Sequence, residues 1–160
     1  LMFSGMINGL ILEQYDRAFI ALPILVTFIP MLTGTGGNSG AQSSTVIIRG
    51  MVLGEIQFRD LGKVIWKELK ISIIAGVVLS AIDFVRIYFG YGQNVALAFT
   101  VSISLIVIII VAKISGAILP ILANKLNLDP ATMASPLITT IVDAVGLIIY
   151  FNVALRVLPI

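Results

Sequence analysis

The strongest constraint on how this chain folds is its division into long apolar runs separated by short charged turns. Residues 95–122 contain a single charged side chain, Lys113, and residues 18–48 contain none. A helix that crosses a bilayer needs about 20 consecutive, mostly apolar residues. The pattern therefore predicts an all-α membrane protein with five transmembrane helices. The expected helices cover residues 1–12, 18–48, 71–89, 95–122 and 130–158.

The composition supports a membrane protein and limits its chemistry. Charged residues make up 11% of the chain, whereas a soluble domain carries roughly 25% and needs them to cover its surface. The chain has no cysteine and no histidine, which excludes disulfides, thiolate metal sites and imidazole ligands. A bound cation would then be a hard ion held by oxygen. The net charge of +2 is too small to indicate nucleic-acid binding.

The basic residues predict an orientation, because Lys and Arg are enriched in cytoplasmic loops. Residues 49–70 hold five of them and are expected to lie at the membrane interface, with Trp66 as a headgroup anchor, and Lys125 follows the fourth run. These segments are expected to face the cytoplasm, which leaves the carboxyl end outside. The expected location is the cell (inner) membrane, as a multi-pass protein in contact with lipid.

A carboxylate in the middle of the last run, Asp143, is the clearest functional candidate. Charged groups inside a membrane span are costly and usually functional. Ser135, Thr139 and Asp143 are spaced by four residues and so form one polar stripe on a helix. Pro136 is expected to kink or break this helix. Asp143 either forms an ion pair with Lys113 or Arg86 of another span, or provides a cation site on a water-filled path; the second hypothesis is favoured.

A second unusual segment, residues 30–45, places glycines, hydroxyls and amides inside an apolar run. Gly36 and Gly40 have the spacing that allows close helix packing. Asn38 and Gln42 are four residues apart and share a face. A packing interface alone does not need so many polar groups, whereas irregular backbone at membrane depth can line a cavity and turn carbonyls toward ions. The glycines do not form a phosphate-binding loop, because no Gly-Lys-Ser/Thr follows them.

The remaining charges have simpler interpretations. Lys113 is expected to snorkel to the interface. Asp83 and Arg86 are three residues apart and can pair on one helix face. A metal site made by the loop carboxylates is possible in principle, but solvated carboxylates are the simpler expectation. These carboxylates are Glu55, Asp60 and Asp129.

Two segments together resemble the MgtE family of magnesium channels and their solute-carrier relatives. The first runs from residue 30 to residue 42 (PMLTGTGGNSGAQ) and is followed by TVIIRG at residues 45–50 and Gly54-Glu55. The second begins with Asp129-Pro130 and continues with PLITTIVD at residues 136–143 and GLIIYF at residues 146–151. The order, the spacing and the five-span layout are similar to those of the family over nearly the whole chain.

The resemblance implies a homodimer of five-helix subunits, with a pore at the subunit interface lined by the second and fifth helices. Mg²⁺ is the implied transported ion and ligand, and Asp143 its main ligand. Backbone or side-chain oxygens at Gly34, Asn38, Ser135 and Thr139 would surround the ion, and Asp129 would help a cytoplasmic metal site. The other implied pore-lining residues are Gly36, Gly37, Gln42, Pro136 and Thr140.

Residues 1–160 would then be the pore domain, with the first helix truncated. Typical members of the family also carry cytosolic regulatory domains and a plug helix, which are not found in this sequence and are possible partners. Two Asp143 carboxylates across a dimer axis would repel each other, and a divalent cation would relieve that repulsion. Mg²⁺ dehydrates reluctantly, so water would lie between ion and carboxylate.

Other functions stay open. One is an exchanger that couples divalent cations to Na⁺ or H⁺, and another is a channel for Mn²⁺, Ca²⁺ or Co²⁺. An intramembrane aspartyl protease requires Gly-x-Gly-Asp, which is missing before both Asp83 and Asp143. A passive membrane anchor does not explain Asp143. The chain is therefore expected to be a transporter and not an enzyme.

Overall fold

The computed structural model describes residues 2–15, 20 and 22–158, with the backbone alone at residues 3, 4, 133 and 135. Over these residues the structure is helical and contains no strand, which confirms the predicted all-α class. The α-helices are α1 (Met2–Gln14), α3 (Ile29–Val52), α4 (Leu61–Gly90), α5 (Val95–Lys125) and α6 (Pro130–Val157). Two short 3-10 turns, η1 (Pro23–Phe28) and η2 (Phe58–Asp60), precede α3 and α4.

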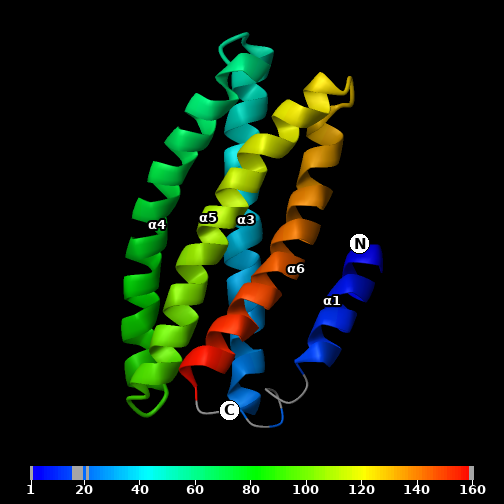
Figure 1. Cartoon of the computed structure of the whole chain (residues 1–160). Helices are drawn as coiled ribbons and strands as arrows, with labels where there is room; N and C mark the ends of the chain where they lie inside the picture. The colour runs from blue at the N-terminus through cyan, green and yellow to red at the C-terminus, as the bar shows by residue number, and fades with distance from the viewer. Residues whose placement is uncertain (1, 16–19, 21, 159–160) are drawn as a thin grey trace.

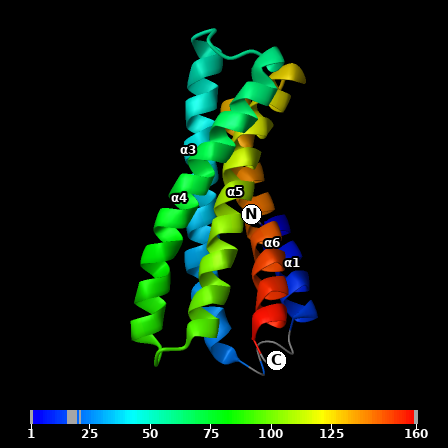
Figure 2. The same ribbon diagram turned by 60° about the vertical axis from the view of Figure 1, so that its left-hand side comes forward.

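Helix α5 is the centre of the bundle and packs against α3, α4 and α6. Helix α3 also packs against α6, and α1 packs mainly against α6 on the side away from α4 (Figures 1 and 2). The α3–α4 and α5–α6 connections lie together at the upper end in Figure 1. We call this the basic end, because six basic residues lie near it. They are Arg49, Arg59, Lys63, Lys67, Lys70 and Lys125.

Three of the helices in the described part of the chain are long and apolar enough to cross a membrane. These spans are Phe58–Gly90, Val95–Lys125 and Pro136–Val157. Helix α1 has 13 residues, which corresponds to about 20 Å at 1.5 Å per residue. Helix α3 is longer, with 24 residues, but its glycines, hydroxyls and amides lower its hydropathy. Membrane crossing by α1 and α3, and so the count of five spans, stays a prediction.

Two predicted helix boundaries are wrong. Helix α4 begins at Leu61 and not at residue 71, so Lys63, Lys67 and Lys70 lie on a helix and not in a loop. Its start is fixed by η2, where the Gln57 amide donates to Asp60 Oδ2 over 3.1 Å. The second run is divided, because η1 interrupts it before α3 begins at Ile29.

Helix α6 begins where the sequence indicates. Asp129 is its N-cap and Pro130 occupies the first turn. Pro136 does not break the helix, which continues to Val157. The Thr139 and Thr140 hydroxyls both donate to the Pro136 carbonyl, over 3.0 and 2.8 Å. Of the expected kink or break, the break is therefore wrong, the kink stays a prediction, and Asp143 lies on an uninterrupted helix.

A seam of glycines lets α3 approach its neighbours closely. A Cβ atom on Gly36 would lie 2.6 Å from side-chain carbons of Ile108 and Val142. A Cβ on Gly116 of α5 would collide with the carbonyl oxygen of Gly40, so at this crossing backbone meets backbone. Small residues have this role in membrane helices generally. The close-packing interpretation of Gly36 and Gly40 is thus consistent with the structure.

Candidate cation site

A cavity of about 410 Å³ lies between α3 and α6, and Asp143 is part of its lining. It collects four of the residues expected near a cation: Gly34, Asn38, Thr139 and Asp143. Gly37, expected to line a pore, also lines it. The remaining lining residues are Pro30, Thr33 and Ala41.

Helical periodicity explains why these residues meet. Successive residues on an α-helix turn by about 100°, so Gly34, Gly37 and Ala41 fall on one side of α3. Thr139 and Asp143 are one turn apart on α6 and face that side. The glycines leave the α3 backbone uncovered, since a Cβ on Gly34 would have no neighbour within 4 Å. On α3 the cavity is thus lined by backbone at Gly34 and by side chains such as those of Thr33 and Asn38. Helix α3 is continuous from Ile29 to Val52, so the expectation of irregular backbone in this segment is wrong.

The Asp143 carboxylate is half-buried in this cavity. No described residue forms a hydrogen bond or ion pair with it. The two cations considered as its partners are paired elsewhere. Arg86 Nη2 lies 2.7 Å from Asp83 Oδ1, as the spacing of that pair predicts, and Lys113 Nζ lies 3.8 Å from Glu68 Oε2. The hypothesis of an Asp143 ion pair is therefore wrong for this structure.

Several predicted pore residues lie outside the cavity. Gly36 is buried in the glycine seam, against α5 and α6. Gln42 is exposed on α3. Pro136 and Thr140 lie on α6 but are not part of the lining. The side chain of Ser135 is outside the described part of the structure. The role of each in permeation stays a prediction.

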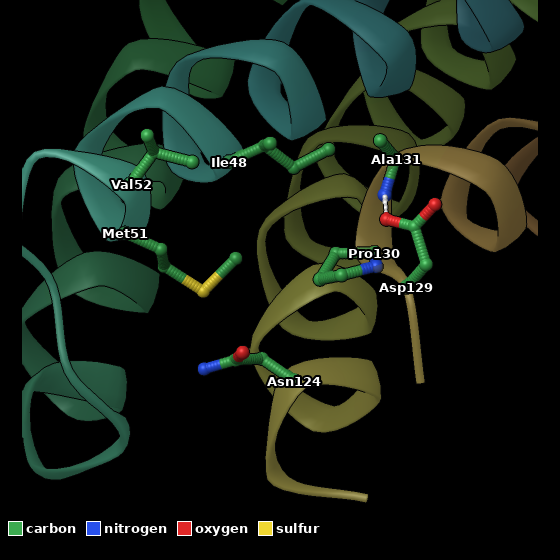
Figure 3. A pocket seen from close by; sticks show the side chains of 7 residues that line it. All are labelled: Ile48, Met51, Val52, Asn124, Asp129, Pro130 and Ala131. Carbon is green, nitrogen blue, oxygen red and sulfur yellow. Dashed lines mark hydrogen bonds between the residues drawn. The ribbon is translucent and has the colours of Figure 1, made fainter. Parts of the chain in front are cut away.

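Asp129 lies at the basic end, in a separate cavity of about 230 Å³ between the end of α3 and the start of α6 (Figure 3). Its Oδ1 accepts a hydrogen bond from the Ala131 amide over 3.0 Å, and its Oδ2 accepts one from the Thr132 hydroxyl. These bonds, led by the one from Thr132, lower the pKa of Asp129 below its usual value. Both oxygens thus serve as the cap of α6.

The loop carboxylates Glu55, Asp60 and Asp129 do not line one common cavity. Glu55 and Asp60 line a different cavity from Asp129, one shared with Lys63, Lys67 and Glu68. The described residues contain no group of three or more acidic side chains that could hold a metal. Glu55 and Asp129 are exposed and Asp60 is partly buried.

The sequence interpretation missed a buried polar network that joins three helices. Ser43 of α3, Glu68 of α4 and Lys113 of α5 meet between the helices, with 2%, 5% and 8% of their surfaces exposed. Lys113 therefore does not snorkel to the interface. One signal was present: Val64, Glu68 and Ser72 repeat every four residues, which is the pattern of a buried helix face. Lys63, Lys67 and Lys70 lie beside these positions and make the segment resemble a charged loop.

Comparison with known proteins identifies the family. Residues 29–153 match the family model for MgtE, described as a divalent cation transporter. The chain belongs to the MgtE family. The match begins with α3 and ends within α6, so it includes both helices that enclose the Asp143 cavity. The predicted resemblance is thereby confirmed.

Three curated relatives of this MgtE-family chain are named magnesium transporter MgtE. The protein from Thermus thermophilus is 36% identical over 154 residues, and that from Bacillus subtilis is 38% identical over 154 residues. The protein from Enterococcus faecalis is 33% identical over 155 residues. Each comparison covers 96% of this chain and 34% of the relative. The chain thus spans about a third of the length of the relatives it matches.

Proposed function

We propose that this chain forms the ion-conducting part of a magnesium transporter, and that Mg²⁺ binds in the cavity between α3 and α6. The observation that carries the proposal is the Asp143 carboxylate, which lines the cavity without a partner among the described residues. An uncompensated charge at membrane depth is costly. A cation that passes along the cavity would compensate it.

The lining suits a hard ion that keeps its water. The candidate ligands are carboxylate, amide, hydroxyl and backbone oxygens, which Mg²⁺ prefers. Six waters at about 30 Å³ each occupy roughly 180 Å³. The cavity of about 410 Å³ has room for an ion of that size. Asp143 would therefore select a hydrated cation through intervening water.

The exposure of the cavity supports a homodimer. Gly34 and Asn38 are exposed, so a second subunit placed against this face would complete the site. Two Asp143 carboxylates would then share one pore at the subunit interface. Their mutual repulsion would favour a divalent over a monovalent ion, because the larger charge offsets both.

The basic end is proposed to face the cytoplasm, which places the carboxyl end outside. The structure brings Lys125 to the same end as Arg59 and Lys63, and Lys125 Nζ lies 3.8 Å from the Phe58 ring centroid. Loops rich in Lys and Arg stay on the cytoplasmic side. Because the relatives are about three times as long, cytosolic regulatory regions are proposed partners of this part.

The proposal is tested by Asp143→Asn, which removes the charge and keeps the shape of the side chain. We expect Mg²⁺ uptake into proteoliposomes to fall at least about tenfold, since an interaction with a charged group contributes roughly 1.5–3 kcal/mol. Uptake would be followed with an entrapped Mg²⁺ dye.

Asp83→Asn is the matched control, because Asp83 is a buried carboxylate that pairs within its own helix. Wild-type uptake by Asp143→Asn, or equal losses in both variants, would contradict the proposal. The same vesicles decide between the alternatives. Uptake that requires a Na⁺ or H⁺ gradient would indicate exchange, and equal uptake of Mn²⁺, Ca²⁺ or Co²⁺ would indicate a general divalent channel.

A further inference from the structure

The buried network behind α3 is a continuous chain of hydrogen bonds. Lys113 Nζ donates to Ser43 Oγ over 3.2 Å, and the Ser43 hydroxyl donates to Glu68 Oε2 over 2.6 Å. Lys113 Nζ and Glu68 Oε2 are 3.8 Å apart. The serine hydroxyl therefore accepts from the cation and donates to the anion, and it links α3 to both.

The network lies inside the bundle and not at its edge. At 1.5 Å per residue, Glu68 lies about 10 Å and Lys113 about 18 Å from the basic ends of their helices. Charges at this depth are costly, and a buried ion pair is not by itself a source of stability. Its best-attested use is to fix one helix arrangement among several.

Ser43 lies on the side of α3 opposite the cation cavity. Ser43 follows Gly34 by nine residue steps, a rotation of about 900°, which puts the two residues about 180° apart around the helix. Gly34 and Asn38 line the cavity, whereas Ser43 is held from behind by α4 and α5. A rotation of α3 would move both faces together.

The glycine seam does not fix that rotation by itself. At Gly40 and Gly116 the helices meet backbone to backbone, which sets how close they come. At this one crossing no side chain interlocks, although one turn away Ile108 of α5 packs against Gly36. The hydrogen bonds of Ser43 beside this crossing are directional, so they can resist rotation and sliding of α3, as one polar residue fixes register in a coiled coil.

We propose that Glu68 and Lys113 are positioning residues for the cation site. Through the Ser43 hydroxyl they fix the rotation and depth of α3, so that Gly34 and Asn38 face Asp143. This inference rests on the proposed function, because it takes the α3–α6 cavity to be the cation site. Neither residue contacts the ion; each acts through α3.

The variants are chosen so that no buried charge is left alone. Ser43→Ala removes the link on α3 and keeps the ion pair. The double variant Glu68→Gln/Lys113→Gln removes both charges together. Loss of one buried hydrogen bond corresponds to about a fivefold effect. We expect each variant to raise the half-saturating Mg²⁺ concentration for uptake about that much, at an unchanged amount of folded protein in the vesicles.

A distance measurement separates positioning from a general loss of fold. The chain has no cysteine, so spin labels can be placed on cysteines introduced at Val46 of α3 and Leu122 of α5, both exposed. We expect the double variant to shift or broaden the distance distribution between the labels.

Two controls match the variants. Ser104→Ala removes a buried α5 hydroxyl that bonds only within its helix, to the Thr100 carbonyl over 2.7 Å. Ser72→Ala removes a buried α4 hydroxyl that bonds within its helix, to the Leu69 carbonyl over 2.8 Å. We expect neither to change the half-saturating concentration or the label distances.

The positioning proposal requires both changes. An unchanged half-saturating concentration, an unchanged distance distribution, or equal changes in the controls would each overturn it. Asp143→Asn in the same vesicles tests the proposed function by uptake alone. A failure of the proposed function is thus distinguishable from a failure of the positioning role.

Discussion

Glu68 and Asp143, two carboxylates on the long apolar helices α4 and α6, differ in whether they have a partner. Glu68 is almost fully buried and has a serine and a lysine as partners. Asp143 is half-buried, lines a cavity and has no partner among the described residues. The contrast is informative because Glu68 shows that this fold can pair a buried carboxylate with a lysine and a serine, whereas Asp143 has no such partner. Because the Asp143 carboxylate has no partner among the described residues, its cavity, and not the buried network, is the candidate for binding an ion.

At the same scale, the cap of α6 predicts a pH-dependent effect. The pKa of Asp129 is lowered in the folded state, so its stabilising contribution is present above the ordinary pKa and is lost as the pH falls through the folded value. We expect Asp129→Ala to lower the melting temperature in detergent at pH 7, and the difference from the wild type to shrink below about pH 4.

Glu13→Ala is the control for this cap, because Glu13 is an exposed carboxylate without a hydrogen bond to any described residue. Asp129→Ser should keep most of the wild-type melting temperature at pH 7, since serine is also a good N-cap. A difference that stays constant from pH 7 to pH 3 would show that the carboxylate charge is not the cause.

Residues differ in how far the sequence predicts their role. Asp143 stands out because it interrupts an apolar run, and its helical spacing from Thr139 predicts a shared face. Gly34 and Asn38 were assigned to the site by resemblance, and the cavity includes both. The Ser43–Glu68–Lys113 network was not predicted, because spacing within one helix does not tell which helix will lie beside it. Pairing across helices depends on packing that only the structure shows.

Among the elements, α3 combines a side that lines the Asp143 cavity with a tightly packed side. Its glycines serve different purposes: Gly34 faces open space, whereas Gly36 and Gly40 are pressed against neighbouring helices. The sequence predicts that the glycine-rich segment is unusual as a whole, but it does not show which glycines line the cavity and which pack against other helices. The start of α4 was misplaced for a related reason, because its lysines resemble a loop until their buried neighbours are known.

The glycine seam predicts a large effect of a small change. In Gly116→Ala the added methyl would meet the Gly40 backbone, which cannot turn aside as a side chain can. Overpacking costs about 1–3 kcal/mol, and against fixed backbone we expect the upper part of this range, which exceeds the gain of about 1 kcal/mol from the higher helix propensity of alanine. We therefore expect a lower melting temperature and less folded protein in detergent.

Gly62→Ala provides the matched control on α4, since a Cβ there has no neighbour within 4 Å. It should be neutral or slightly stabilising. Equal stability of Gly116→Ala and Gly62→Ala would show that α3 and α5 can separate without cost.

For the molecule as a whole, the asymmetry of its two ends predicts an orientation in the membrane. A chain without cysteine allows single cysteines to be introduced at Leu53, near the basic end, and at Tyr91, near the opposite end. On intact cells, we expect a membrane-impermeant maleimide to label Tyr91→Cys and not Leu53→Cys. Both should be labelled after the membrane is opened. The reverse pattern would show that the basic end faces outward.

The contact between Gly40 and Gly116 also has a mechanical consequence. Side chains between two helices can change rotamer when the helices move closer, but two backbones in contact cannot. The closest approach of α3 and α5 at this crossing is therefore limited by backbone contact. Because α3 is one wall of the Asp143 cavity and cannot move closer to α5 at this crossing, we expect the cavity to widen mainly by displacement of α6.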